Sequence, residues 1–514
     1  MSATPVVPVV IVGAGPTGVA AATLLAQYGI QCLVLDRWAG VYPQPRAVHL
    51  DDEICRIMAY LGIGEEFAAI SRPARGLRLL DQNRRVLAEF CRAHASSVHG
   101  FPEANMFDQP ELEALLRANL EKLATVRLRG NVEVTEISQD GRGRLQVDFT
   151  DRLTGQPESV LAHYMLGCDG ANSLVRSAIG ASMEDLGFAQ RWLVVDVATK
   201  EELGAWEGVH QVCDPVRAAT YMRIGETRYR WEFSLQAGET AADYSEITAL
   251  HPLIAPWTKG IARGELEVVR VAEYTFRAQL ADRWRQGRVF LLGDAAHLTP
   301  PFIGQGMGAG LRDAMNLAWK LAGVLHGCLA EEVLDTYETE RMPHARALIR
   351  LAILMGWAMT AGGELGNLAR RLIVPRLRLI PGFRQKVLDS KTPPLHRSAL
   401  VHSGRGVRGL AGRLCPNPVT DGHSRFDDLF AGRFVLVTSR PLTATQRAKV
   451  EERGAAIVTA APGDELHHWL RRGRARAALV RPDRTVMRPG RDLDRLCHAV
   501  PALATGLQVC GPNC

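Results

Sequence analysis

The segment Gly13–Gly18, which reads GAGPTG, has the residue types and spacing of a loop that binds the phosphates of a dinucleotide. Gly13 permits a tight turn, Gly15 lets the backbone come close to a pyrophosphate, and Gly18 allows the following helix to pack closely. The start of that helix offers unpaired N–H groups and the positive end of its dipole to the phosphates. Taken alone, the motif predicts binding of an adenine dinucleotide and leaves the reaction open.

An acidic residue at the end of the next apolar run favours the same interpretation. Asp36 follows the run Ile30–Leu35, about twenty residues after the glycine loop, where dinucleotide-binding proteins place a carboxylate. A carboxylate at this point accepts hydrogen bonds from ribose hydroxyls and repels a 2′-phosphate. We assign Asp36, its neighbour Arg37 and Pro16 of the glycine loop to the nucleotide site.

Two further polar loops follow apolar runs. The sequence GDAAH at Gly293–His297 comes directly after the run Val289–Leu292, and CDGANSLVR occupies Cys168–Arg176 after the run Val160–Gly167. With the glycine loop, these segments resemble the three fingerprints of the class A flavoprotein aromatic hydroxylases, the family of 4-hydroxybenzoate and phenol hydroxylases. The fingerprints occur in that family's order, and the resemblance covers roughly residues 1–380.

Shorter segments resemble one subgroup of that family, the 3-(3-hydroxyphenyl)propionate hydroxylases. They are YPQPRA at 42–47, DDE at 51–53, WLVVD at 192–196, CDPVR at 213–217 and RWEF at 230–233. The resemblance implies an FAD-dependent monooxygenase that hydroxylates a phenolic substrate through a flavin C4a-hydroperoxide, with NADH or NADPH as electron donor and O2 as oxidant. The subgroup indicates a substrate similar to 3-(3-hydroxyphenyl)propionate, and a polycyclic natural product is the alternative.

The resemblance also implies cofactor contacts, residue by residue. Asp294 matches the aspartate at the ribityl or pyrophosphate part of FAD, and Arg46 and Gln109 match positions at the phosphates or the ribityl chain. Asp169 belongs to a motif linked to both FAD and the pyridine nucleotide. The predicted cofactor site comprises Gly13, Gly15, Pro16, Gly18, Asp36, Arg37, Arg46, Gln109, Asp169, Gly293, Asp294, Pro300, Gly304, Gly306 and Met307.

The segment from Pro300 through residues 304–308 matches the part of the family that lies along the isoalloxazine ring. A helix that begins near Gly306 would aim its positive end at the flavin and stabilise its anionic reduced form. For His297, packing beside the flavin and proton transfer both stay open, and no catalytic residue is identified. Asp51 and Asp52 are expected to cap a helix that begins near Glu53 rather than to take part in catalysis.

A substrate carboxylate would require a cationic partner, and arginine is the commonest one in buried sites. Four arginines lie in the segment expected to bind substrate, and the alternation of strand faces turns only some of them inward. These residues are Arg217, Arg223, Arg228 and Arg230. We expect most of them to lie on the surface, and none is singled out as the carboxylate partner.

Two other functions stay open at this stage. A flavoprotein oxidase or dehydrogenase without oxygen insertion would share the glycine loop, but it does not predict the Asp169 and Asp294 motifs together. A nucleotide-binding scaffold or regulator is the third hypothesis. Formation of a product that has gained one oxygen atom distinguishes the monooxygenase from both.

The elements that must position these loops indicate an α/β fold. A strand at 9–12, a helix at Val19–Tyr28 and a strand at 30–35 form a strand-helix-strand unit, which predicts a Rossmann-like parallel sheet for the FAD-binding domain. The segment Glu111–Leu123 is a predicted helix, and the alternating pattern over Val126–Val147 predicts antiparallel strands. The β-rich region from Arg191 to Tyr274 is an antiparallel substrate sheet inserted into that domain.

The expected domain boundaries follow from these patterns. Residues 1–385 form the FAD-binding monooxygenase region, with FAD-binding parts at 1–75, 105–185 and 280–385 and the substrate sheet at 76–104 and 186–279. Residues 386–414 are a linker rich in proline, glycine and arginine. By resemblance, residues 415–514 form a thioredoxin-like domain without a redox Cys-x-x-Cys, and the terminal Cys510 and Cys514 are expected to have no redox role.

Composition is that of an ordinary globular protein. Of the 514 residues, 47% are hydrophobic and 23% charged, and the net charge of +6 is small for this length. We expect a soluble cytoplasmic enzyme with reduced cysteines and no metal site, because the ten cysteines lack metal-ligand spacing. The expected partners are a small aromatic substrate and O2, without nucleic acid or membrane, and a homodimer is one option for the oligomeric state.

Overall fold

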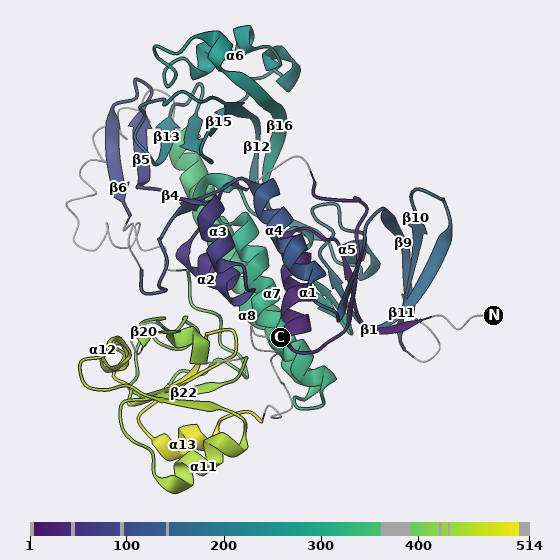
Figure 1. The fold of residues 1–514 in the computed structure, drawn as a ribbon, viewed down its shortest axis with the longest axis vertical. Helices are drawn as coiled ribbons and strands as arrows, with labels where there is room; N and C mark the ends of the chain where they lie inside the picture. Colours follow the sequence, from purple (N-terminus) through teal and green to yellow (C-terminus); the bar gives the residue numbers. More distant parts are fainter. Residues whose placement is uncertain are drawn as a thin grey trace.

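The computed structural model describes residues 5–42, 47–92, 97–139, 143–360, 392–420, 424–429 and 432–502, and its ribbon is shown in Figure 1. Three predictions fall on residues outside these ranges. They are the cofactor contact of Arg46, the part of the expected linker before residue 392, and the tail Cys510–Cys514.

A mixed sheet with parallel central strands, here called the first sheet, is built around strand β1 (Val6–Val12). β1 pairs in parallel with β2 (Cys32–Leu35) on one side and β11 (Pro157–Gly167) on the other. Its C-terminal half, from Val9 to Val12, is buried, as expected for a β-branched run covered on both faces. The central strands β1 and β11 therefore end at the glycine loop and at the loop after Gly167.

The first sheet extends to β8 (Val126–Arg129) beyond β2 and to β18 (Val289–Leu291) beyond β11, both in parallel orientation. The prediction of antiparallel strands across 126–147 is therefore wrong for β8. The helix α4 (Gln109–Glu121) precedes β8, and a helical crossover returns the chain parallel to its neighbour. Antiparallel pairing holds for β9 (Val132–Gln139), β10 (Leu145–Asp151) and β11.

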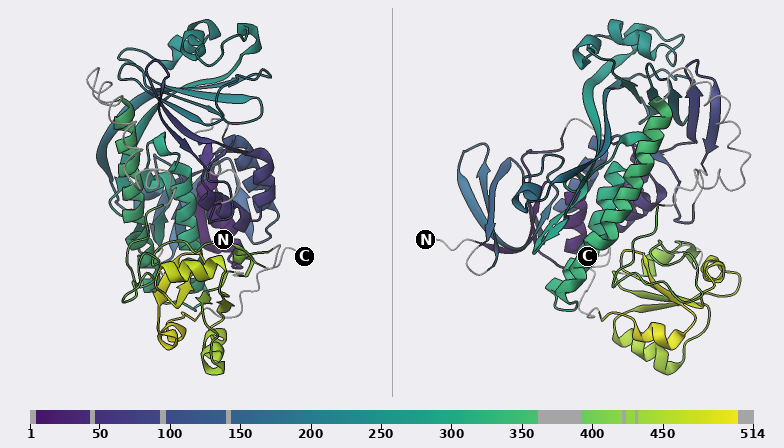
Figure 2. Two further views of the ribbon diagram at one scale, coloured as in Figure 1. Left: turned by 90° about the vertical axis from the view of Figure 1, so that its left-hand side faces the viewer. Right: turned by 180° about the vertical axis from the view of Figure 1, so that it is seen from behind.

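Helices α1 (Pro16–Gln27) and α7 (Gly306–Leu325) pack against each other beside the first sheet. Glycine makes this packing close: a Cβ on Gly310 would lie 2.2 Å from Thr17 Oγ1. The long helix α8 (Asp335–Thr360) continues from this region to the second sheet, as Figure 2 shows from behind. None of the helices within the described ranges has the length and apolar character needed to cross a membrane.

The second sheet runs in the order β19-β16-β12-β15-β14-β13-β5-β6, and only β5 and β13 pair in parallel. Its strands are β5 (Gly76–Asp81), β6 (Val86–Cys91), β12 (Met183–Ala198), β13 (Val209–Cys213), β14 (Ala219–Arg223), β15 (Arg228–Ser234), β16 (Glu267–Ala281) and β19 (His297–Leu298). Alternation along β15 places Tyr229, Trp231 and Phe233 in the core under α6 (Ile247–Ile254). Arg230 and Glu232 therefore lie on the opposite face, which we call the inner face.

The C-terminal residues form a separate small mixed sheet, seen in yellow-green at the bottom of Figure 1. β22 (Val435–Thr438) pairs in parallel with β23 (Ala456–Thr459) and antiparallel with β24 (Ala477–Val480), which continues in a hairpin to β25 (Val486–Gly490). The flanking helices are α11 (Ala444–Glu452), α12 (Glu465–Arg472) and α13 (Leu493–His498). Residues 481–485 form the turn of this hairpin.

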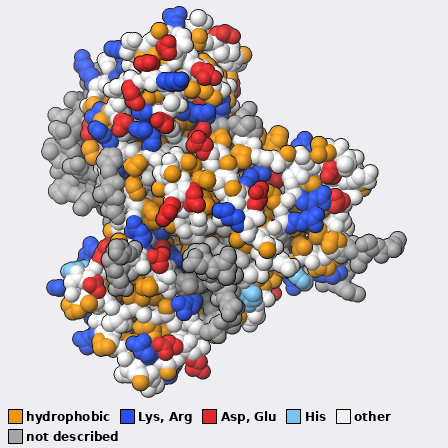
Figure 3. Space-filling model, viewed as in Figure 1, with side chains coloured by type: hydrophobic (Ala, Val, Ile, Leu, Met, Phe, Trp, Pro, Cys, Tyr) orange, Lys and Arg blue, Asp and Glu red, His pale blue; other side chains and the backbone are white. Residues whose placement is uncertain are grey.

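The remaining elements are short. They are β3 (His49–Leu50), β4 (Arg72–Pro73), β7 (Asn105–Met106), β17 (Arg285–Gln286), β20 (Val419–Thr420), β21 (Ser424–Arg425), α2 (Asp52–Tyr60), α3 (Gly64–Ile70), α5 (Leu174–Ala178), and the 3-10 turns η1 (Ala241–Tyr244), η2 (Arg263–Glu265), η3 (Gly293–Ala295), η4 (Pro301–Ile303), η5 (Glu331–Leu334) and η6 (Phe426–Leu429). On the face seen in Figure 3, acidic and basic side chains are interspersed over the regions of the first sheet, the second sheet and the C-terminal sheet.

Candidate functional site

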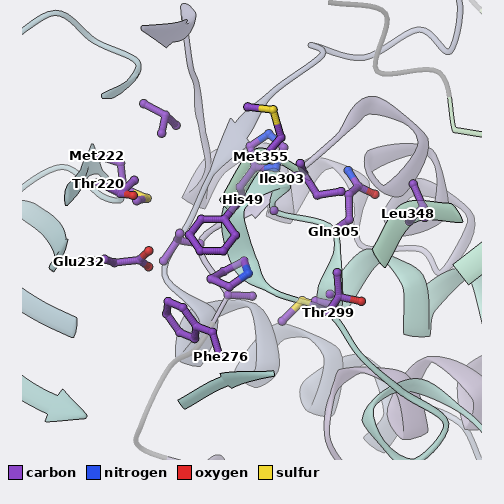
Figure 4. A pocket seen from close by; sticks show the side chains of 18 of the residues that line it. His49, Thr220, Met222, Glu232, Phe276, Thr299, Ile303, Gln305, Leu348 and Met355 are labelled. Atoms are coloured by element: carbon purple, nitrogen blue, oxygen red, sulfur yellow. The ribbon is translucent and has the colours of Figure 1, made fainter. Parts of the chain in front are cut away.

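A cavity of about 1580 Å³ lies between the loops at the end of the first sheet and the inner face of the second sheet. Figure 4 shows part of its wall, with Glu232 and Met222 on one side and Gln305 and Leu348 on the other. The members of the predicted cofactor site that line it are Gly15, Pro16, Gln109, Gly293, Asp294, Gly304, Gly306 and Met307. The cavity therefore brings together residues of the glycine loop, the two fingerprint loops and the segment after Pro300. The Asp36–Arg37 pair and the segments 51–53 and 213–217 do not line it.

The three glycines of the first loop have different surroundings. Gly13 has a φ of +103°, and a Cβ there would lie 2.3 Å from the carbonyl oxygen of Cys168. A Cβ on Gly18 would lie 2.0 Å from the carbonyl oxygen of Gly13. By contrast, no atom lies within 4 Å of a Cβ built on Gly15, so the first and third glycines serve packing while Gly15 borders open space in the cavity.

The carboxylate of Asp36 holds the glycine loop from behind. It accepts hydrogen bonds from the backbone N–H of Ala14 at 2.5 Å and from that of Trp38 at 2.7 Å. Arg37 is exposed, and its carbonyl accepts a hydrogen bond from Arg152. Neither Asp36 nor Arg37 is among the residues that line the cavity.

Asp169 organises its own loop. Its carboxylate accepts from Ser173 Oγ at 2.5 Å and from the N–H of Val175 at 3.1 Å, at the start of α5. Arg176 donates to the carbonyls of Ala171 and Ala295, at 2.9 and 3.1 Å. The two fingerprint loops are thereby fixed to each other, and Gly170, Ala171 and Asn172 face the cavity.

The loop that carries Asp294 is held by a buried ion pair. The N–H of Gly293 donates to Asp313 at 3.0 Å, and the same carboxylate pairs with His297 at 2.7 Å and with Arg341 at 2.8 Å. Burial raises the pKa of Asp313, but Arg341 and His297 outweigh it and hold that pKa below its usual range. His297 is buried away from the cavity, which favours the packing role for this residue.

The glycine-rich segment after Pro300 forms the start of α7. Gly304 has a φ of +63°, and a Cβ there would lie 2.7 Å from His49 Nδ1. α7 begins at Gly306, as predicted, so its N-terminus faces the cavity. Pro300 itself is buried beneath this segment and is not among the cavity-lining residues.

Gln305 is fixed by a polar network with α2. It donates to Asp51 at 2.8 Å and accepts from Arg312 at 2.8 Å, and Arg312 also pairs with Glu53. Asp51 caps α2 by accepting from the N–H of Ile54, so the predicted capping role is confirmed for Asp51, whereas Asp52 is the first residue of the helix. On the other side of the cavity, Gln109 accepts from the N–H of Ala47 at 2.6 Å.

The inner face of the second sheet carries Arg230, one of the four arginines considered in the sequence, and polar residues to which the sequence analysis gave no role. Arg230 is fully buried and donates to both oxygens of Asp196, at 2.6 and 2.8 Å. Arg270 lies 3.7 Å from the same carboxylate, and Glu232 and Gln211 line the cavity beside them. The alternation of polar and aromatic residues over 229–233 was the available signal, but the face that meets the cavity depends on the fold.

The other three arginines considered as carboxylate partners lie at strand ends or in the loop before β14, and they are partly buried rather than on the surface as expected. Arg217 pairs with Glu239, Arg223 with Glu202, and Arg228 with Asp108. Within the described residues, no group of three or more His, Cys, Asp or Glu side chains is arranged to hold a metal ion.

Known proteins match this chain over most of its length. A family model described as "FAD binding domain" matches residues 6–352. A Mycobacterium sp. (strain JLS) protein named "3-(3-hydroxy-phenyl)propionate/3-hydroxycinnamic acid hydroxylase" is 33% identical over 478 residues, which cover 89% of this chain and 81% of the relative. A Rhodococcus jostii (strain RHA1) protein named "Probable NADH-specific resorcinol 4-hydroxylase" is 37% identical over 354 residues, covering 69% of this chain and 66% of the relative.

Solved structures share the fold. The flavin-dependent monooxygenase PieE, solved with FAD and substrate, has a TM-score of 0.77 and 23% identity, with 96% of this chain and 98% of that chain covered. Aklavinone-11 hydroxylase, solved with FAD and aklavinone, has a TM-score of 0.77 and 22% identity, with 97% and 98% covered. At these identities, the likeness establishes the architecture of the chain.

Proposed function

The chain belongs to the family of FAD-dependent aromatic hydroxylases, and we propose from its cavity that it hydroxylates a phenol next to the existing hydroxyl group, with NADH as electron donor. The observation that carries the proposal is the single cavity that joins the open space at Gly15 to the polar inner face of the second sheet. Such a cavity can hold a dinucleotide and an aromatic ring together.

The residues at one end of the cavity fit FAD. The open space beside Gly15, at the N-terminus of α1, suits a pyrophosphate because backbone N–H groups can approach it. Asp294 is proposed to hold the ribityl chain, and the segment Gly304–Met307 to lie along the flavin ring. When bound, FAD supplies the activation of O2, and the protein supplies orientation, electrostatics and exclusion of water.

The walls at the other end of the cavity suit an aromatic ring. Met222, Phe276 and Phe302 provide apolar surface, and Phe276 and Phe302 pack edge to face at 6.2 Å. The few polar groups among them are concentrated on the inner face of the second sheet. Apolar walls with a small number of placed polar groups are typical of sites for small organic ligands.

For the substrate class, we propose a phenolic acid similar to 3-(3-hydroxyphenyl)propionate. Several curated relatives are identical to this chain at about a third of the aligned residues, and their names support this class. Arg92, Arg270 and Arg277 lie in the cavity wall and could receive a carboxylate. A polycyclic natural product stays the second candidate for the substrate.

A substrate screen tests both parts of the proposal. Purified protein loaded with FAD is mixed with NADH or NADPH and with phenolic acids, neutral phenols or polycyclic quinones, and the products are weighed by mass spectrometry. Phenolic acids should accelerate NADH oxidation and gain one oxygen atom. If only neutral polycyclic compounds do so, the phenolic-acid class is wrong while the hydroxylase stands.

We also propose the domain division 1–385, 386–414 and 415–514, with a thioredoxin-like relationship for the last part. The order β22-α11-β23-α12-β24-β25-α13, with β22 and β23 parallel and β24 and β25 antiparallel, supports that relationship.

For the oligomeric state we propose a homodimer. The exposed side chains of Leu354 and Trp357 on α8 offer apolar surface for such a contact, and light scattering measures it.

A further inference from the structure

Three polar residues lie side by side across neighbouring strands of the inner face. Gln211 on β13 is the cross-strand partner of Thr220 on β14, and Thr220 is the partner of Glu232 on β15. All three line the cavity, and Figure 4 shows the carboxylate of Glu232 extending into it towards the side of His49 and Phe276. We call Gln211, Thr220 and Glu232 the acceptor row.

The acceptor row has hydrogen-bonding capacity that the described part of the chain leaves unused. Glu232 is only 7% exposed, and its carboxylate receives no hydrogen bond from the described residues. Gln211 donates through Nε2 to the carbonyl of Phe302 at 2.9 Å, while its Oε1 is buried without a partner in the described ranges. Buried acceptors without partners are costly, so a ligand that brings donors would be stabilised here.

The neighbouring charges allow Glu232 to change its protonation state. Burial raises its pKa to about 7, Arg230 and Arg270 oppose this rise, and Asp196 adds to it. Arg230 is already held by two hydrogen bonds to Asp196 and does not pair with Glu232. Thr220 beside Glu232 carries no charge. Burial lowers the pKa of His49, across the cavity, to about 4, so that ring is neutral at pH 7.

We propose that the carboxylate of Glu232 binds the phenolic hydroxyl of the substrate and takes its proton, with Gln211 accepting from a second donor on the same ligand. This inference rests on the proposed function. The O–H bond of the phenol breaks, an O–H bond forms on Glu232, and the electron pair stays on the phenolate oxygen. The ring thereby becomes richer in electrons at the carbon next to that oxygen, which is where the hydroxyl group is added.

The test compares wild type with Glu232→Gln and Glu232→Asp, each loaded with FAD. Glu273→Gln is the matched control, because Glu273 lies on strand β16 of the same sheet, separated from β15 by β12, is exposed and pairs with Arg191. The probes are resorcinol, 3-(3-hydroxyphenyl)propionate and their O-methyl ethers. Bound FAD is measured by absorbance, probe binding by the change in the flavin spectrum, and product per NADH by chromatography.

Glu232→Gln should keep FAD and form product slower by a factor on the order of 10²–10⁴, the usual range for loss of a general base. Its KM should change far less than its kcat, and its kcat/KM should no longer rise with pH through about 7 as that of the wild type does. Glu232→Asp should recover part of the rate, and Glu273→Gln should match wild type. Product formation by Glu232→Gln at the wild-type rate, or with the same pH profile, would overturn the proposal.

The binding measurement separates this inference from the proposed function. Wild type should bind each phenol more tightly than its O-methyl ether, and Glu232→Gln should lose most of that preference, because the ether has no proton to donate. If no phenol is hydroxylated by wild type, the proposed function fails, and the binding preference still tests Glu232. If phenols are hydroxylated but the preference is the same in both proteins, the role of Glu232 is wrong.

Discussion

Arg481, in the hairpin of the C-terminal sheet, donates to both carboxylate oxygens of Glu340 in α8, at 2.9 and 3.0 Å. Both side chains are fully buried, and Glu340 also pairs with Lys320 of α7 at 2.8 Å. The next residue in α8, Arg341, pairs with the Asp313 carboxylate that fixes Gly293. Glu340, which anchors the C-terminal part, is therefore the sequence neighbour of Arg341, which supports the loop of the proposed flavin site through Asp313.

We predict that Arg481→Met destabilises the protein by about 3–5 kcal/mol, because removal of one partner leaves a buried carboxylate without its main counter-charge. Urea denaturation measures the free energy of unfolding. The control is Arg471→Met, since Arg471 is exposed at the end of α12. Equal stability of the two variants would contradict the anchoring role of Arg481.

The C-terminal part makes a second buried contact, between Asp427 and Arg56 of α2, and this contact predicts that the stability of the fold decreases in acid. Asp427 accepts two hydrogen bonds from Arg56, at 2.5 and 2.6 Å. Burial raises the pKa of Asp427, but Arg56 and Arg484 outweigh it and lower the pKa from 3.8 to about 2. The stability from this carboxylate is thus complete above pH 3.8 and is lost as the pH falls through about 2.

Asp427→Asn should therefore weaken the dependence of unfolding free energy on pH within that window, while also lowering stability at neutral pH. Chemical denaturation at a series of pH values measures both effects. An identical slope in wild type and variant would show that the Asp427 carboxylate is not held by Arg56 and Arg484.

The glycine loop gives a pair of variants with opposite expected outcomes. Gly15→Val should fold but purify without FAD, because its side chain enters only the open space proposed for the pyrophosphate. Gly18→Val should destabilise the fold, because its Cβ would meet the backbone carbonyl of Gly13 at 2.0 Å. Flavin absorbance and circular dichroism distinguish the two. Retention of normal FAD content by Gly15→Val would place the pyrophosphate elsewhere.

Asp294→Ala should weaken FAD binding. Hydrogen bonds to a charged group contribute about 1.5–3 kcal/mol, so the Kd for FAD should rise roughly 10- to 100-fold. Recovery of flavin fluorescence on titration of apoprotein measures this change, and Asp335→Asn, on the exposed first turn of α8, is the control. The assignment of Asp294 fails if both variants bind FAD like wild type.

Features that depend on neighbouring residues in the chain were predictable from the sequence. The strand-loop-helix around Gly15, the cap at Asp51 and the start of α7 at Gly306 follow from local spacing and backbone preference. The closeness of three separated loops was predictable only through the resemblance to a family. The parallel pairing of β8 was missed because the alternating pattern of Val126–Val147 does not reveal the direction of a neighbouring strand.

Features that depend on long-range contacts were not predictable. Arg56 and Asp427 are separated by 371 residues, and nothing near either residue indicates the other. Glu232 stands in a strand whose alternate residues were noted, but only the packing of α6 decides which face is covered and which meets the cavity. Whether a charged strand residue is exposed or belongs to a site depends on that choice of face.

Oxygen insertion is tested most directly by supplying isotopically heavy oxygen gas to the FAD-loaded enzyme with NADH and a phenolic substrate, and measuring the mass of the product. We expect a product that carries one heavy oxygen atom and is formed in proportion to the NADH consumed. NADH consumption that yields only hydrogen peroxide with every phenol, or a product whose added oxygen comes from water, would contradict this expectation.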